Sequence, residues 1–251
     1  MSALLEIVDD LDLFLNVSQV KDYPGAKNGL QVENSGEVKR VVAAVDASEA
    51  VLRSCGEEPG TLLLVHHGLY WQDMVPVTGY RYRKMKWMLE RDMAVYSAHL
   101  PLDIHREVGN NVLLAQAIGL REVKEFFGKS GDVLGLIGEW SQNGDALCER
   151  VEAAVGGAVH RCGKRSEEPR RVAVITGGAG SEVEWVAAQG VDVFVTGEAP
   201  HWAAPLAEEL GVELLLGGHY ATEVFGVKAL AERVSQKFSL PWEFKDFPTG
   251  L

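Results

Sequence analysis

The feature that most constrains the fold is an apolar run, Thr61–Val65, followed directly by His66, His67 and Gly68. Five apolar or β-branched residues in a row predict a strand that is buried on both faces of a sheet. Imidazole is the commonest neutral nitrogen ligand of Zn, Fe and Ni, so two histidines at a strand end could bind metal. On a regular strand they would face opposite ways, but beyond its end both can face one cleft. Two surface histidines after a core strand explain this stretch alone equally well.

Composition narrows the classes of protein that the chain can belong to. The 251 residues are 47% hydrophobic and 24% charged, which is ordinary for a globular protein with one large or two modest domains. The net charge of −12 argues against nucleic acid and anionic membranes as partners. The chain has no apolar segment of about 20 residues and no basic, apolar leader, so we expect a cytoplasmic protein.

The three cysteines do not form a recognisable site. Cys55, Cys148 and Cys162 are widely spaced and contain no C-x-x-C pair. This pattern is typical neither of a disulfide framework nor of a thiolate zinc site, and we expect them to be small buried residues.

Predicted strands and helices alternate along the chain, which predicts an α/β fold. Strands are expected over residues 38–45, 61–65, 94–99, 133–137, 171–175, 191–195, 213–216 and 242–244. Helices are expected over residues 3–15, 47–55, 84–91, 108–118, 145–155, 181–189, 200–210 and 219–238. Residues 28–32 are expected to be a loop, because Asn28-Gly29 is a strong turn signal.

These elements divide into two predicted α/β lobes with mixed sheets flanked by helices. The first lobe comprises residues 1–121 and the second residues 122–251, with the last helix returning to the first lobe. Both lobes have a strand, a helix and a second strand that ends in polar residues. Ligands of open α/β sheets bind beyond the carboxyl ends of strands, and His66, His67, Asp103, Glu198 and His219 follow predicted strands.

Three residues outside the histidine pair are also candidate metal ligands. His219 and Glu223 are four residues apart, which places both side chains on one face of a helix, although a surface ion pair has the same spacing. Asp103 follows a strand and the proline at position 101, where a helix cap or turn acid is the alternative. Five candidate ligands exceed a single four-coordinate site with one open position and suit two ions about 3.5–4 Å apart.

Seven stretches together resemble the GTP cyclohydrolase I type 2 homologue family, and its YbgI-like members most closely. They occur in the same order over about residues 27–230. The stretches are Asn28–Val32, Val65–Gly68, Ser97–Asp103, Gly109–Asn111, Thr176–Gly178, Val195–Glu198 and Gly218–Glu223.

The resemblance implies a dinuclear metal site in the cleft between two α/β lobes, and a homohexameric ring with its sites facing an internal cavity. His67, Asp103 and Glu223 would hold one divalent ion. His66 and His219 would hold the other, with Glu223 bridging both. Histidine and carboxylate ligands fit Zn, Fe, Mn or Ni without selecting one of them.

Several other residues allow two interpretations. His99 could be a general base or a core histidine. Glu198 could face the substrate or cap a helix, and His201 could also face the substrate. Gly177–Gly180 could hold a phosphate, but it lacks the Walker lysine, and a tight turn explains it better. Tyr70 and Trp71 could stack on a base or simply pack. The basic cluster, which could attract phosphates or be a solvated face, consists of Arg81, Arg83, Lys84 and Lys86.

The leading hypothesis is a metal-dependent hydrolase that acts on a nucleotide-like small molecule, with His99 or Glu198 handling protons. The family name implies ring opening of GTP. One alternative is a phosphoesterase that uses the same two ions. The other is a metal-binding hexameric scaffold, metallochaperone or regulator without turnover.

Overall fold

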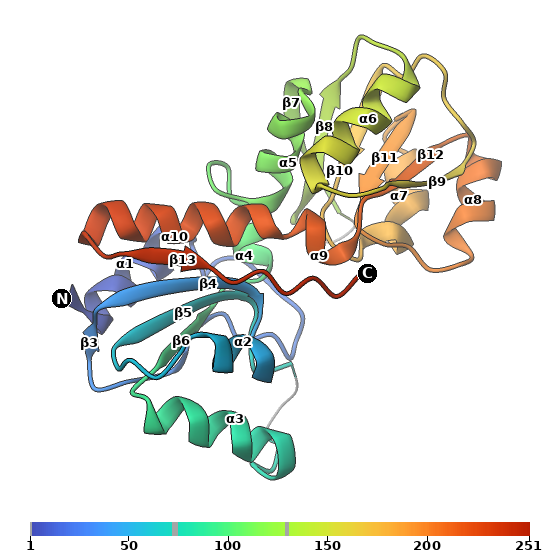
Figure 1. The fold of residues 1–251 in the computed structure, drawn as a ribbon. Coiled ribbons are helices and arrows are strands. Elements are labelled where there is room, and N and C mark those ends of the chain that lie inside the picture. The colour runs from blue at the N-terminus through green and yellow to red at the C-terminus, as the bar shows by residue number, and fades with distance from the viewer. Residues whose placement is uncertain (1, 72–74, 129–130) are drawn as a thin grey trace. The chain divides into compact units, whose positions relative to one another are not determined.

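The chain forms two compact units in the computed structural model, which describes residues 2–71, 75–128 and 131–251 (Figure 1). The first unit comprises residues 1–102 and 226–247, and the second comprises residues 103–225 and 248–251. The lobe boundary predicted at residue 121 differs from these bounds. Helix α5 (Asn110–Ile118) belongs to the second unit because Leu114 and Ile118 pack in its apolar core with Leu147 of α6 (Gly144–Val155).

The first unit is built on a five-stranded mixed sheet. Its strand order is β13 (Trp242–Phe244), β4 (Arg40–Asp46), β5 (Thr61–His67), β6 (Ala94–Ser97) and β2 (Gly29–Val32). The first four strands are parallel, and β2 adds antiparallel to β6. Parallel strands require both faces of the sheet to be covered, which explains the continuous apolar runs of β4 and β5.

Helices cover both faces of this sheet. One face packs on α2 (Glu49–Ser54) and α3 (Gly79–Glu90) through a core that includes Leu52, Leu63 and Met88. Figure 1 shows α1 (Leu4–Phe14) and α10 (Val224–Phe238) on the other side. The Tyr96 hydroxyl of β6 donates to Asp12 of α1 at 2.7 Å. The unit also contains the short pair β1 (Ser2–Ala3) and β3 (Glu37–Val38), and α4 (Leu100–Asp103) begins there.

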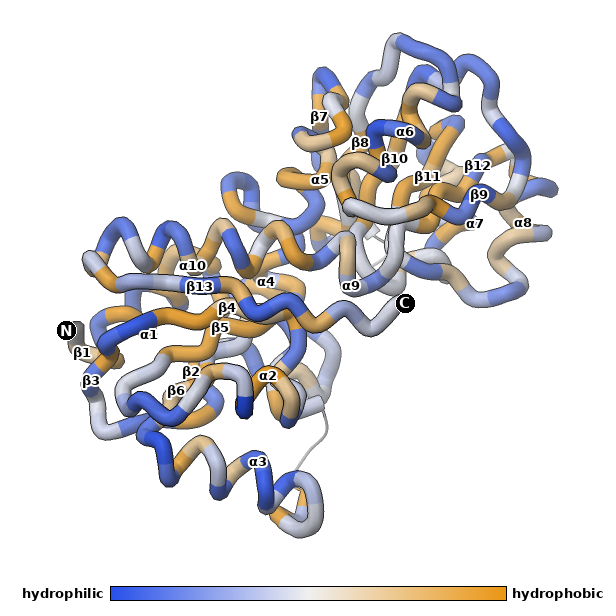
Figure 2. Tube along the Cα trace, in the orientation of Figure 1, coloured by the Kyte–Doolittle hydropathy of each residue, from blue (hydrophilic) through white to orange (hydrophobic). Residues whose placement is uncertain are grey.

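The second unit is built on a six-stranded mixed sheet. Its order is β7 (Arg121–Phe127), β8 (Val133–Glu139), β10 (Arg171–Val174), β11 (Val193–Thr196), β12 (Glu213–Leu216) and β9 (His160–Gly163). The central strands β10, β11 and β12 are parallel, and the outer three are antiparallel to their neighbours. The central strands of this sheet are apolar, and Figure 2 shows them mostly in the colours of hydrophobic residues.

Both faces of the second sheet are also covered by helices. Helices α5 and α6 pack on one face through Ile118, Val151 and Val174. The 3₁₀ turn Ala179–Glu182, α7 (Val183–Ala187) and α8 (Ala203–Leu210) cover the other face, where Val186 and Ala207 contact Phe194. The predicted fold, an α/β protein with two mixed sheets flanked by helices, is confirmed.

Besides the two-residue strand β1, three strands were not expected from the sequence. Residues 29–32, predicted as a loop, form β2, because Leu30 pairs with Tyr96 across the sheet edge. The turn signal at Asn28-Gly29 is nevertheless real, since Gly29 has a φ of 100°. The other two, β7 and β9, are outer strands without a fully buried face, and their residues show no apolar pattern. Only the neighbouring strands define them.

Two predicted element ends are also wrong. Strand β5 continues through His66 and His67 instead of ending before them. The final helix is interrupted at Glu223, which has a φ of −109° and a ψ of 3° and separates α9 (His219–Thr222) from α10. Both changes occur at predicted metal ligands.

Candidate metal centre

The histidine pair of the first unit lies at the carboxyl end of β5. His66 is fully buried and His67 is half-buried, and their ring centroids are 4.7 Å apart. Asp46, the last residue of β4, is the register partner of His67. The parallel strands β4 and β5 therefore bring polar side chains together where both end.

The Nδ1 atoms of this pair make defined hydrogen bonds. His66 Nδ1 donates to the backbone carbonyl of Ala98 at 2.9 Å, and His67 Nδ1 contacts Asp46 Oδ1 at 2.9 Å. A carbonyl or carboxylate oxygen accepts, so the proton lies on Nδ1 and the lone pair of the neutral ring lies on Nε2. Metal-binding histidines have this arrangement, because the second hydrogen bond fixes the ring and its tautomer.

His99 joins the pair as a third histidine of the same unit. One ligand nitrogen from each of His66, His67 and His99 lies within 4.8 Å of the other two. His99 Nδ1 contacts Asp22 Oδ1 at 2.8 Å. Burial of Asp22 opposes its ionisation, but hydrogen bonds from His99 and Asn28 and the charge of His99 outweigh this and lower the pKa of Asp22 to about 2. Asp22 is therefore a carboxylate that holds His99 in place.

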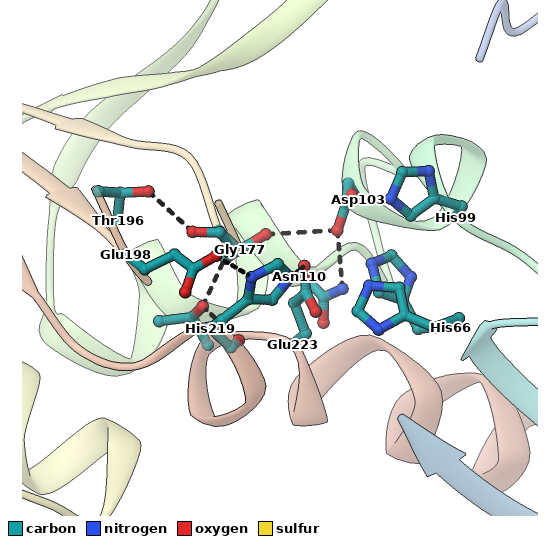
Figure 3. Close-up of polar contacts among 12 residues, drawn as sticks. His66, His99, Asp103, Asn110, Gly177, Thr196, Glu198, His219 and Glu223 are labelled. Atoms are coloured by element: carbon teal, nitrogen blue, oxygen red, sulfur yellow. Dashed lines mark hydrogen bonds and ion pairs between the residues drawn. The ribbon is translucent and has the colours of Figure 1, made fainter. Parts of the chain in front are cut away.

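His219 of the second unit lies between two carboxylates (Figure 3). Its Nδ1 contacts Glu198 Oε1 at 2.9 Å, and its Nε2 contacts Glu223 Oε1 at 3.3 Å. The hydrogen bond with Glu223 raises the pKa of His219 to about 9, against burial and with help from Glu198. Glu198 thus orients His219 as Asp46 orients His67, and the predicted contact of His219 with Glu223 survives the break between α9 and α10.

Asp103 is a buried carboxylate at the end of α4. The Asn110 side chain donates to Asp103 Oδ1 at 2.8 Å (Figure 3), and the Thr176 hydroxyl donates to the same oxygen at 3.3 Å. A carboxylate oxygen of Asp103 and one of Glu223 lie within 4.8 Å of each other. Two buried acids this close repel each other when both are ionised, and a bound cation relieves that repulsion.

The glycine turn after β10 makes room for Glu223. Gly177 has a φ of 70°, and a Cβ there would overlap Glu223 Oε1. The Gly177 amide donates to the Thr222 hydroxyl at 2.9 Å, and its carbonyl accepts from Gly197 and Glu198. These bonds favour a tight turn over a phosphate loop, because the amide already has an acceptor.

The residues present fit a divalent metal ion. His66 and His67 present Nε2 with Nδ1 held by an acceptor, and His219 contacts a carboxylate through each ring nitrogen. Two carboxylates, Asp103 and Glu223, are more than 90% buried. Buried carboxylates and neutral imidazoles suit divalent transition metals, and such charges are otherwise costly to bury. The described residues thus contain candidate His, Glu and Asp groups for metal binding.

The sequence interpretation missed four residues that hold predicted site residues. Asp46 follows a predicted strand, so the rule that ligands lie at carboxyl ends could have identified it. Asn110 lay in a stretch that carried the resemblance, and Thr176 in another, but neither had been assigned a partner. Asp22 has no sequence signal, because its contact with His99 joins residues 77 positions apart.

The remaining candidates occupy different surroundings. His201 is exposed just before α8, away from the contacts described above. Glu198 contacts His219, and His99 contacts Asp22. The proton-transfer roles proposed for Glu198 and His99 stay predictions. Trp71 lies edge-on to His99, with centroids 4.9 Å apart, and 5.7 Å from His67. The cysteines are unpaired and two of them are buried.

By fold and site, this is an α/β protein with a candidate metal centre of histidines and buried carboxylates. It belongs to the Duf34/NIF3 (NGG1p interacting factor 3) family, whose model matches residues 3–248. The family resemblance found in the sequence is thereby confirmed. In the described residues, no helix has the length and apolar character that a membrane span requires.

Known relatives match the chain over nearly its whole length. A protein of Deinococcus radiodurans named GTP cyclohydrolase 1 type 2 homolog is 36% identical over 248 residues, 98% of this chain and 94% of that protein. The crystal structure of TTHA1606 from Thermus thermophilus has a TM-score of 0.90 and 35% identity, covering 99% of this chain and 100% of that one. The solved structure of the protein ybgI has a TM-score of 0.87 and 34% identity, with 99% and 100% coverage.

Proposed function

We propose that this protein is a metal-dependent hydrolase that acts on a nucleotide-like small molecule. In this proposal two divalent ions, of Zn, Fe, Mn or Ni, are held by the five predicted ligands, with Glu223 bridging. The ligands are His66, His67, Asp103, His219 and Glu223. The name of the relatives, GTP cyclohydrolase 1 type 2 homolog, supports a nucleotide as the substrate class.

The observation that carries the proposal is the shared geometry of the histidines. His66, His67 and His219 each have Nδ1 at 2.9 Å from an oxygen, of Ala98, Asp46 and Glu198 respectively. A histidine that only fills a core does not need an oxygen acceptor at Nδ1 to fix the direction of its Nε2. Three such histidines, together with buried carboxylates, are typical of a metal centre with its supporting hydrogen bonds.

The chain's own residues would perform the remaining steps. Divalent ions bound there would supply Lewis acidity and would lower the pKa of water. His99, with its Nδ1 held by Asp22, presents Nε2 as a group that can accept a proton from water and return it to a leaving group. Glu198 is half-exposed and holds His219 Nδ1, so it acts as a positioning residue for His219.

The test compares the wild-type protein with the variants Glu223→Gln and Glu223→Ala after anaerobic purification. Metal content per chain is measured first, and the same samples are then given GTP, GMP and a phosphodiester. Glu223→Gln keeps the side-chain volume, and circular dichroism checks that each variant folds. Glu184→Ala, which removes an exposed acid on α7, is the matched control.

We expect about two ions per chain in the wild type and in Glu184→Ala, and fewer in both Glu223 variants, with hydrolysis falling in parallel. Hydrolysis of the phosphodiester alone would favour the phosphoesterase alternative. Two ions without turnover would contradict the hydrolase and favour a metal-binding scaffold or metallochaperone. A wild-type chain without metal would overturn the proposed centre.

A further inference from the structure

A cavity of about 270 Å³ lies beside the histidine group of the first unit. One wall is formed by residues 69–71, 75 and 77 after β5, and the other by the inward face of helix α3. Trp71 belongs to both places, because its ring lines the cavity and lies 4.9 Å from the His99 ring. A ligand in this cavity would therefore lie next to the histidines.

The lining combines aromatic and apolar surface with positive charge. Met85 and the buried Met88 form apolar lining from α3, while the rings of Trp71 and Tyr80 are 41% and 51% exposed. Such half-exposed rings provide flat faces against which a planar ligand can stack. A cavity of 270 Å³ is near the lower end of the range for small-molecule sites, about 300–1,000 Å³, and suits one ring system with one anionic group.

Four cations of α3 differ in their partners. Arg83 pairs with Glu49 at 3.3 Å, and Lys86 pairs with Glu90 at 3.6 Å. Arg81 and Lys84 line the cavity, and neither forms an ion pair with a carboxylate among the residues that the structure describes. The Arg81 guanidinium lies over one face of the Tyr80 ring, 4.7 Å from its centroid, which leaves its charge unpaired and the other face of the ring for a ligand. Their spacing of three residues places them on one helix face. The two cations that face the cavity are therefore available to an anion.

The start of α3 adds to this positive potential. Its first turn contains no acidic residue, and no side chain caps its N-terminus at Thr78. A helix N-terminus favours negative charge because its first amides have no partner within the helix. Lys84 is half-buried, and this burial lowers the pKa of its ammonium group. The negative charges of Glu49 and Asp46 raise the pKa but do not outweigh the burial. A bound anion would stabilise a cation held in this position.

We propose that this cavity binds an aromatic anion of mononucleotide size, with the ring stacked on Trp71 and Tyr80 and the anionic group held by Arg81 and Lys84. The inference rests on the proposed function in one respect, since it takes this ligand to be the substrate of the neighbouring centre. It assigns two members of the basic cluster, Arg81 and Lys84, a role in substrate recognition. It also names Trp71 as the residue common to the cavity and the histidines.

The experiment is isothermal titration calorimetry with three probes: GMP, guanosine and inorganic phosphate. It uses the full chain both as purified and after metal removal with a chelator. The variants are Arg81→Ala, Lys84→Met and Trp71→Ala, and Lys86→Ala is the matched control because Lys86 pairs with Glu90. Circular dichroism checks the fold of each variant.

We expect GMP to bind both wild-type preparations with a dissociation constant of about 1 mM or tighter. Arg81→Ala, Lys84→Met and Trp71→Ala should each weaken GMP about tenfold, and Lys86→Ala less than twofold. Guanosine and phosphate should each bind more weakly than GMP, because each retains only one half of the contacts.

Any one of the following results would overturn the inference. They are no binding of GMP, binding of guanosine as tight as that of GMP, and equal weakening by Arg81→Ala and Lys86→Ala. Weak binding of phosphate alone would mean a simple anion site and would also overturn it. GMP binding is measured also without metal, so the two proposals can fail separately. A chain that binds GMP but no metal would contradict only the proposed function. A chain that binds metal but not GMP would contradict only this inference.

Discussion

At the scale of single residues, the candidate centre depends on side chains that orient other side chains. Asp46 and Glu198 each contact the Nδ1 of a predicted ligand at 2.9 Å. Such contacts keep the metal-binding nitrogen in one tautomer and one direction. Variants of the orienting residues therefore test the centre without removing a ligand.

The first prediction concerns Asp46→Asn. We expect this change to lower metal affinity about tenfold, because an amide oxygen is a weaker partner for His67 Nδ1 than a carboxylate. Competition with a chromophoric chelator measures the affinity. Glu57→Gln, which alters an acid whose side chain is 78% exposed, should bind metal as the wild type does. Equal affinity in Asp46→Asn would show that His67 does not need this partner.

The second prediction concerns Gly177→Ala. The added methyl would meet the Glu223 carboxylate, and the φ of 70° costs a non-glycine residue about 1–2 kcal/mol. We expect a lower free energy of unfolding and reduced metal content, measured by urea denaturation and elemental analysis. The control is Gly157→Ala, which has open space around its Cβ. Unchanged metal content in Gly177→Ala would mean that Glu223 can move without loss.

At the scale of elements, α1 and α10 are joined by charge as well as by apolar packing. Asp10 of α1 accepts hydrogen bonds from Arg233 at 2.6 and 3.2 Å and from Lys237. Arg233 also stacks on Phe14, 3.7 Å from the ring centroid. The hydrogen bond with Arg233, opposed by burial and aided by Lys237, lowers the pKa of Asp10.

The third prediction follows from the sign of this shift. A folded-state pKa below the unfolded value of about 3.9 stabilises the protein above that pH, and the stabilisation is lost as the pH falls through the lower folded pKa. Asp10→Asn should therefore reduce the free energy of unfolding by about 1 kcal/mol at neutral pH. Urea titrations should show the difference from wild type shrinking below about pH 3.9. A difference that persists in strong acid would indicate packing instead of charge.

Outer strands show where local pattern fails as a guide. Strand β7 has mostly exposed and charged residues, and β2 is short, so neither shows the apolar alternation that predicts a strand. Each is defined by hydrogen bonds to a neighbour, β8 or β6. In contrast, the start of α2 depends on a local contact, since the Ser48 hydroxyl accepts from the Val51 amide within one turn.

At the scale of the whole molecule, the family resemblance supports a homohexamer as the working assembly. The fourth prediction is a mass six times the 27.4 kDa of the chain, measured by light scattering after gel filtration. The net charge of −12 per chain opposes association, so the measurement belongs at physiological salt, where charges more than about 8 Å apart are screened. A monomer at all concentrations would contradict the hexamer.

By itself, the sequence determined the α/β class and the core strands, and it predicted five candidate ligands. These are local properties: apolar runs mark buried strands, and chemically suited residues follow strand ends. The tertiary structure decided which partners hold the ligands, because His67 meets Asp46 across 21 residues and His219 meets Glu198 across 21 residues. It also decided the outer strands and the break at Glu223. Such contacts depend on sheet register and turn geometry, which no short stretch of sequence contains.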